Sequence, residues 1–349
     1  MTEHILRGGN LSAMHGLSRS PERDNAQPWT GDLSSTAGLI PLETAAEGRF
    51  QSGQNGVGRI YATGDRKAEL ILFANHTLVW IKSEMGYPAL YPLLPARIAR
   101  PIKAVLMDLD GTSVRSEEFW GWIIEQTTAR LLNNPKFQLE QADIPHVSGH
   151  SVSEHLQYCI SKYCPGRKVE EARSFYFEIT HNEMKAIMEG HGRTGAFKPS
   201  AGLKEFLLEL RRRNIKIGLV TSGLYEKAWP EILSAFQTMQ MGDPKSFYNA
   251  IVTAGFPLHK GEVGTLGELS AKPHPWLYAE VARVGLGIPF AERQHVIGLE
   301  DSGAGVLSIR LAGFSAIGMA LGNIQQSGTQ ALLQAYCHTF DEVLKIIEG

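Results

Sequence analysis

The stretch IKAVLMDLDGT, residues 102–112, predicts a strand that ends in chemically active side chains. Its first six residues form a short and mainly apolar run, which is typical of a strand buried on both faces of a parallel sheet. Asp108 and Asp110 follow directly, one residue apart. Because ligands bind at the carboxyl ends of strands in open parallel sheets, we expect both carboxylates at the functional edge of the molecule.

Similar runs recur after this strand and indicate that it belongs to a larger sheet. They are IKIGLV (215–220), AIVTA (250–254), HVIGL (295–299) and AIGMA (316–320). Helical patterns lie between them, as in SAGLKEFLLELRRRN, and we also expect helices at 302–312 and 327–335. This alternation predicts an α/β fold with a Rossmann-like, doubly wound parallel sheet.

Residues 114–196 interrupt the alternation, because they contain no convincing buried strand. Their apolar spacing predicts amphipathic helices at 117–132, 151–162 and 169–189. We therefore expect residues 114–196 to form an inserted α-helical cap. The sheet domain would then consist of residues 101–113 and 197–349.

The first hundred residues have a different texture from the rest. Residues 1–56 are rich in Gly, Ser, Thr and Asn without a sustained period, and we interpret them as a poorly ordered leader. Residues 57–100 are expected to form an N-terminal β-rich extension. It begins with the strand-like runs GRIYA, AELILFA and HTLVWIK, and ends in a linker or strap with four prolines, MGYPALYPLLPARIARP.

Composition excludes several classes of protein. The 349 residues carry a net charge of −2, which gives no electrostatic reason to expect binding to nucleic acid or to an anionic membrane. No apolar run reaches the length of a membrane span, and the N-terminus lacks the apolar core of a secretory signal. An odd and small number of cysteines, three, argues against a disulfide framework. We expect a cytoplasmic protein.

The pair Asp108 and Asp110 predicts a cation site. Two neighbouring carboxylates repel each other unless a cation or a shared proton intervenes, and Mg²⁺ is a hard cation that prefers oxygen ligands. Gly111 would allow a tight backbone turn at this point. The alternative is an ordinary polar turn, because Asp-Gly is common in turns.

Three further polar segments are expected at the same edge. Thr221-Ser222-Gly223 follows the second run and offers a hydroxyl and backbone N–H groups to a phosphate, or simply caps a helix. Glu300-Asp301 is a second acidic pair after a strand. Lys272 lies in the proline-rich turn KPHP, where it is either a charge clamp for phosphate or a solvated surface residue.

Taken together, DLDGT, TSG, KPHP and GLEDSGAG resemble the haloacid dehalogenase superfamily of phosphohydrolases, over about residues 102–349. The resemblance implies that Asp108 is the nucleophile that forms an aspartyl-phosphate. It implies that Asp110 is the general acid and then the general base. Thr221, Ser222 and Lys272 would bind the phosphoryl group. The Mg²⁺ ligands would be Asp108, Asp301, the backbone carbonyl of Asp110 and, directly or indirectly, Glu300.

The resemblance also limits the class of reaction that we expect. Relatives that remove halide lack an aspartate at the position of Asp110, because a halide leaving group needs no proton. We therefore expect an Mg²⁺-dependent phosphatase for a small phosphorylated metabolite, such as a sugar phosphate. Two alternatives stay open. One is a phosphomutase of the beta-phosphoglucomutase type, and the other is a catalytically degenerate member that serves as a binding or scaffold protein.

Within the subgroup with a helical cap, a glycine-containing cap loop selects the substrate. VSGHSVSEHL (147–156) resembles that loop, so the candidates are Gly149, His150, Ser151 and Ser153, although His150 is equally an ordinary residue at the start of a helix. Trp120 stands where beta-phosphoglucomutase has a histidine, and Val152 stands at about the position of an arginine in its cap. Both differences weaken the interpretation as a mutase. The long connection 254–273 could bring His259 or Lys260 over the site, but a surface excursion is the simpler interpretation.

Overall fold

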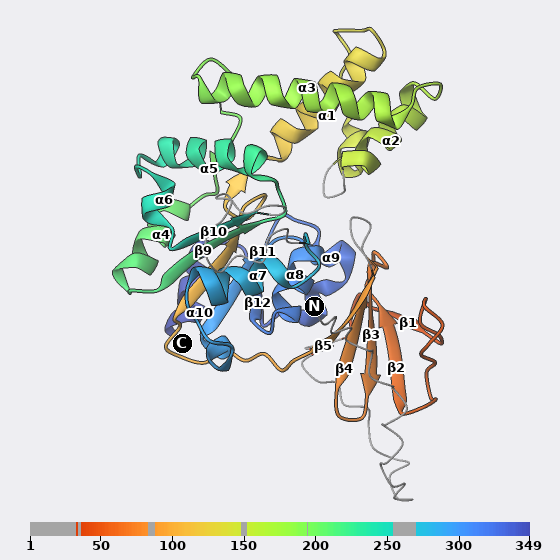
Figure 1. Cartoon of the computed structure of the whole chain (residues 1–349), viewed down its shortest axis with the longest axis vertical. Helices are drawn as coiled ribbons and strands as arrows, with labels where there is room; N and C mark the ends of the chain where they lie inside the picture. The colour runs from red at the N-terminus through yellow and green to blue at the C-terminus, as the bar shows by residue number, and fades with distance from the viewer. Residues whose placement is uncertain (1–32, 34–35, 83–87, 148–151, 194, 254–269) are drawn as a thin grey trace, which may run out of the picture.

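A computed structural model describes residue 33 and residues 36–82, 88–147, 152–193, 195–253 and 270–349 (Figure 1). Its centre is a parallel sheet of six strands in the order β10-β9-β6-β11-β12-β13. The strands are β6 (Ala104–Asp108), β9 (Lys216–Thr221), β10 (Ala250–Thr253), β11 (Val296–Glu300), β12 (Ser315–Met319) and β13 (Ala335–Cys337). The doubly wound sheet expected from the sequence is confirmed.

β6 is the central strand, and both of its faces are covered. All five of its residues are buried. Val105 and Met107 point into one hydrophobic cluster with α4 (Leu203–Arg212), α5 (Tyr225–Met239) and α10 (Phe340–Glu348). Ala104 and Leu106 point into a second cluster with α7 (Trp276–Glu280) and α8 (Gly303–Leu311). Alternating side chains therefore serve opposite faces, which is why this strand reads as apolar throughout.

The helical insertion leaves the sheet through a short stem. β7 (Val114–Arg115) pairs antiparallel with β8 (Lys198–Pro199), so the chain departs and returns at one place. Between them lie α1 (Glu117–Leu131), the 3₁₀ helix η2 (Gln141–His146), α2 (Val152–Tyr163) and α3 (Val169–Met188). The three α-helices match the expected segments to within one residue at each end. Figure 1 shows them stacked beyond one edge of the parallel sheet.

An antiparallel sheet of five strands precedes β6, in the order β1-β2-β3-β4-β5. Its strands are β1 (Ile40–Leu42), β2 (Val57–Ala62), β3 (Ala68–Phe73), β4 (Thr77–Ile81) and β5 (Ala89–Leu93). The expected meander corresponds to β2, β3 and β4 and is confirmed.

Two strands of this sheet correct the sequence analysis. β1 lies inside the segment expected to be a poorly ordered leader, and it pairs with β2 from Ile40 to Leu42. Three residues are too few to show a periodic pattern. β5 lies in the proline-rich segment expected to be a linker, although it contains Pro92. Because β5 is an edge strand, a proline there removes no hydrogen bond that the sheet needs.

The prediction of a helix at 327–335 is also wrong. The segment instead contains the end of α9 (Ile324–Ser327), the 3₁₀ helix η5 (Thr329–Leu332) and the start of β13. Gly328 separates the first two with a φ of +70°, a left-handed conformation that ends a helix. The remaining short elements are α6 (Pro244–Phe247), the π-helical turn η3 (Val281–Gly285) and η4 (Phe290–His295).

The N-terminal sheet shares a hydrophobic core with the parallel-sheet domain. One face of β3 and β4 contributes Leu70, Leu72 and Val79 to the cluster that also contains residues of α7 and α8. Figure 1 shows this sheet beside α8 and α9. The opposite face carries a smaller cluster around Ile60 and Ile71. Within the described ranges, no helix has both the length and the apolar character that a membrane span needs.

The shared core predicts that the N-terminal sheet stabilises the whole molecule. Leu70→Ala should lower the free energy of unfolding by about 2–5 kcal/mol, because Leu70 is fully buried in the shared cluster. Leu78→Ala is the matched control, since Leu78 is only half-buried on the opposite face. Urea denaturation followed by circular dichroism measures both. An equal loss in the two variants would contradict the shared core.

Candidate active site

The segment after β6 makes a tight turn that aims two carboxylates at one edge of the sheet. The Gly111 N–H donates to Val114 O at 2.8 Å, and Gly111 has a φ of +83°. A Cβ atom on Gly111 would lie 2.2 Å from Asp301 Oδ2. Glycine is therefore required here for its backbone conformation and because Asp301 occupies the space beside it.

Three buried carboxylates meet at this edge, and they come from the ends of neighbouring strands. Asp108 ends β6, while Glu300 and Asp301 end and follow β11, which pairs with β6. One oxygen from each lies within 4.8 Å of the others. The Lys272 ammonium contacts both Asp108 and Glu300. The structure thus brings together four of the residues that the sequence singled out.

The charges in this cluster do not balance. Burial raises the pKa of Asp108 well above its usual value, and Glu300 adds to the effect while Lys272 opposes it. Burial and Glu300 also raise the pKa of Asp301 to about 8. Burial disfavours the charged form of Lys272, but Asp108 and Glu300 outweigh this and raise the pKa of the ammonium. Ionising all three carboxyl groups beside one ammonium would leave net negative charge, which a bound metal ion would neutralise.

Protein donors hold the second acidic pair in place. Glu300 Oε1 accepts from Tyr278 OH at 3.0 Å, and Glu300 Oε2 accepts from the Ser302 N–H at 3.1 Å and from Ser302 Oγ at 2.9 Å. Asp301 Oδ1 accepts from Thr112 Oγ1 at 3.3 Å. Oxygen-only carboxylate groups of this kind suit a hard divalent cation such as Mg²⁺.

Asp110 sits in different surroundings from Asp108. Its Oδ1 accepts from Ser116 Oγ at 2.7 Å and from Lys227 Nζ at 3.2 Å, and its Oδ2 lies 3.5 Å from Thr221 Oγ1. Burial disfavours its charge, but Lys227 and Ser116 together lower the pKa of Asp110 below its usual value. The pKa values of the two carboxyl groups, which one residue separates, are therefore shifted in opposite directions.

The sequence analysis did not identify the charged groups next to Asp110. Lys227 Nζ lies 3.9 Å from Glu231 Oε1 and 4.4 Å from the centre of the Trp120 ring. The Trp120 Nε1–H donates to Glu231 Oε1 at 3.2 Å. Burial and Asp110 raise the pKa of Glu231 well above its usual value. In sequence, Lys227 and Glu231 look like an exposed i,i+4 pair, and their only signal is that α5 follows the TSG segment directly.

The two phosphate-binding segments expected from the sequence are tied together. The Lys272 N–H donates to Ser222 Oγ at 3.1 Å, although the two residues lie 50 positions apart. The Gly223 N–H donates to Thr221 Oγ1 at 2.9 Å. Thr221 is buried at the end of β9, which is the other neighbour of β6.

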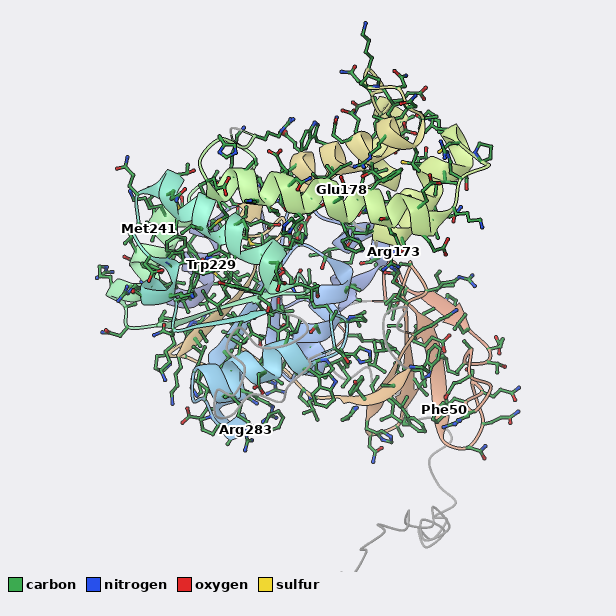
Figure 2. The ribbon with its side chains drawn as sticks, turned by 45° about the horizontal axis from the view of Figure 1, so that its top comes forward. Phe50, Arg173, Glu178, Trp229, Met241 and Arg283 are labelled. Atoms are coloured by element: carbon green, nitrogen blue, oxygen red, sulfur yellow. The ribbon has the colours of Figure 1, made fainter. Side chains whose placement is uncertain are left out.

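The cap-loop candidates are mostly outside the described residues. Gly149, His150 and Ser151 fall there, as do His259 and Lys260 of the long connection. Ser153 is in α2, and its Oγ accepts from Arg173 Nη1 of α3 at 3.2 Å. Figure 2 labels Arg173 and Glu178 along α3.

These features place the chain among α/β proteins that work at the carboxyl edge of a parallel sheet. A model of the haloacid dehalogenase-like hydrolases matches residues 102–313, which is more than half of the chain. The chain belongs to this family of hydrolases, as the resemblance of its motifs predicted.

Solved structures share the fold at low sequence identity. A predicted phosphoglycolate phosphatase from Haemophilus somnus is 16% identical, with a TM-score of 0.54, and the match covers 70% of this chain and 98% of that one. A family IA, variant 3 hydrolase from Entamoeba histolytica is 20% identical, with a TM-score of 0.50, over 71% of this chain and 100% of that one. No curated protein matches the sequence.

The surroundings of Gly111 and of Gly121 predict opposite effects on stability when each glycine is replaced by alanine. Gly111→Ala should destabilise the protein by at least about 1–2 kcal/mol, because alanine disfavours a positive φ and its Cβ would displace Asp301. Gly121→Ala is the control. Gly121 lies in α1 with open space around it, so alanine should stabilise the helix by about 0.5–1 kcal/mol. Urea denaturation measures both, and a neutral Gly111→Ala variant would contradict the turn geometry.

Proposed function

We propose that this hydrolase is an Mg²⁺-dependent phosphatase that acts on a small phosphorylated metabolite through an aspartyl-phosphate on Asp108. The observation that carries the proposal is that Asp108 and Asp110 have different charged neighbours. Asp108 contacts Lys272 within the acidic cluster, whereas Asp110 contacts Ser116 and Lys227. A phosphatase of this kind needs one carboxylate as nucleophile and a second for proton transfer.

In the first step, an Asp108 oxygen attacks phosphorus while the bond to the leaving alcohol breaks. Asp110 gives its proton to that alcohol. In the second step, water attacks the phosphorus of the aspartyl-phosphate while the bond between phosphorus and the Asp108 oxygen breaks. Asp110 takes the proton of the water, Asp108 returns to its carboxylate form, and phosphate leaves. Lys227 favours the ionised form of Asp110, which suits the second step. The negative charge of an incoming phosphate ester raises the pKa of a nearby carboxyl group and so favours the protonated form that the first step needs.

Lys272, Thr221 and Ser222 would hold the transferring phosphoryl group. The Lys272 ammonium already touches Asp108, so it lies beside the position where phosphorus must arrive. Positive charge there stabilises the negative charge of the phosphoryl oxygens in the transition state.

The acidic cluster fits Mg²⁺. Asp108, Asp301 and the backbone carbonyl of Asp110 would hold the ion, with Glu300 as a further ligand or as the support of one. Bound Mg²⁺ neutralises the charges that would otherwise keep a carboxylate away from a phosphate. Gly149, His150, Ser151 and Ser153 would select the substrate, and Ser153 among them lies in α2.

Product analysis separates this proposal from the alternatives. Free phosphate released from sugar, polyol or nucleotide phosphates in the presence of Mg²⁺ identifies a phosphatase. Formation of an isomer without release identifies a phosphomutase. If neither occurs over the whole panel with Mg²⁺ present, the result contradicts the proposal and supports the binding or scaffold alternative.

Asp108→Asn tests the nucleophile. The change is nearly isosteric, so the fold should persist while kcat on p-nitrophenyl phosphate falls by more than about a thousandfold. Rapid-quench mass spectrometry should trap phosphate on Asp108 of the parent. Asp341→Asn, an exposed change on α10, is the control and should leave kcat unchanged. Turnover by Asp108→Asn near the parent rate would rule out this mechanism.

Asp301→Ala tests the metal site. Loss of one carboxylate should raise the Mg²⁺ concentration that half-saturates activity by at least about tenfold, and excess Mg²⁺ should restore part of the rate. A titration of activity with Mg²⁺ gives the answer, with Asp341→Ala as the control. The assignment is wrong if parent and Asp301→Ala respond alike, or if the parent needs no divalent cation.

A further inference from the structure

We propose that the N-terminal β-sheet fixes the position of Lys272, the residue that would hold the phosphoryl group, and that it does so through Tyr91. The family match begins at residue 102, so it assigns no role to this sheet. The inference rests on the proposed function in one respect, because it takes Lys272 to hold the phosphoryl group.

The contact joins β5 to the turn that carries Lys272. Tyr91 OH lies 2.8 Å from His274 Nδ1, across 183 positions of sequence. The Tyr91 ring also meets the rings of His274 and Trp276 edge-on, with centroids 5.9 Å and 6.1 Å apart. His274 is buried and lies only two residues beyond Lys272.

His274 is held from two sides. While Tyr91 contacts its ring, Ser308 Oγ of α8 donates to its backbone oxygen at 2.6 Å. Pro273 and Pro275 flank it, and proline restricts the backbone on either side. Constraint at His274 is therefore passed to Lys272 through a short and stiff piece of chain.

Lys272 needs this constraint because its ammonium has to sit between two buried carboxylates. Its side chain is only 6% exposed and touches Asp108 and Glu300, and its ammonium lies 5.2 Å from the centre of the Tyr278 ring. A lysine side chain is long and flexible, so its charge is placed accurately only if its backbone is fixed. Small displacements of a charged group at the reacting atoms lower the rate steeply.

A second set of contacts joins the same sheet to the other side of the site. The Gly64 N–H donates to Ser327 O at 2.7 Å. The Ser327 side chain packs against Gly303, two residues after Asp301, and the Gly303 N–H donates to Asn323 Oδ1 at 2.8 Å. The N-terminal sheet therefore contacts residues next to Asp301 as well as the turn that carries Lys272.

A third contact attaches the segment after β5 to α8. Arg310 is fully buried, and its Nη2 donates to Leu94 O at 3.3 Å. α8 begins beside the acidic pair and also carries Ser308, which bonds to His274. The bond from Arg310 therefore connects the N-terminal sheet to the helix that contacts both parts of the site. The same guanidinium donates from Nη1 to Phe314 O at 3.2 Å, and losing the bond to Leu94 O would take an acceptor away from a buried charge, which is costly.

Tyr91→Phe tests the inference in the full-length protein. The variant keeps the ring contacts and loses only the hydroxyl, so its melting temperature should stay close to that of the parent. We expect kcat for p-nitrophenyl phosphate to fall roughly tenfold and inhibition by vanadate to weaken by a similar factor, while KM changes little. Hydrogen exchange of residues 270–276 should become faster.

Tyr61→Phe is the matched control. Tyr61 lies in the same sheet and the same hydrophobic cluster, but its hydroxyl accepts from Arg59 Nη1 at 3.3 Å and not from the turn at Lys272. This variant should match the parent in kcat, in vanadate inhibition and in exchange of residues 270–276.

Two results would overturn the inference. One is a Tyr91→Phe variant with parental kcat or parental exchange at 270–276. The other is a lowered melting temperature with kcat and KM impaired together, because this marks a purely structural role. If the parent hydrolyses no phosphate ester, the proposed function fails, and the exchange comparison alone then decides whether Tyr91 fixes the turn.

Discussion

The burial of three carboxylates around a single ammonium is the constraint on which the site depends. Asp108, Glu300 and Asp301 repel one another in a place with little water, and Lys272 offsets only part of that repulsion. Such a cluster is tolerated when surrounding donors and a cation stabilise the charges. The surrounding structure meets this need with the Tyr278 hydroxyl and the start of α8. The site is therefore an electrostatic arrangement that the fold holds in place.

The order of strands explains how residues far apart in sequence reach this cluster. β6 lies between β9 and β11, so the parallel sheet sets the ends of these three strands side by side. Thr221 follows from β9, Asp108 from β6 and Glu300 from β11. The helical insertion leaves through β7 and returns through β8 without disturbing this order. The carboxylates of the cluster therefore come from the sheet, and the helical insertion reaches the site through Ser116, which donates to Asp110, and Trp120, which donates to Glu231.

The N-terminal sheet packs against the parallel-sheet domain through one of its faces and through several hydrogen bonds. It shares a hydrophobic cluster with α7 and α8, and it reaches the supports of Lys272 and Asp301 through Tyr91 and Gly64. On the other side of the site, α5 surrounds Asp110 with Lys227 and Glu231. Asp108 and Asp110 are therefore surrounded by charged groups from different elements, with Glu300 and Lys272 beside Asp108 and Lys227 beside Asp110.

The sequence by itself determined the α/β class, the five longer runs of the parallel sheet, the inserted helices and the residues of the acidic cluster. These features are local, because buried strands and amphipathic helices leave continuous patterns and the polar motifs follow strand ends directly. Only the tertiary structure decided that β1, β5 and β13 are strands, that Lys227 and Glu231 flank Asp110, and that Tyr91 contacts His274. Short edge strands pair through partners elsewhere in the chain, and a contact across 183 positions depends on how two sheets pack, which no local pattern records.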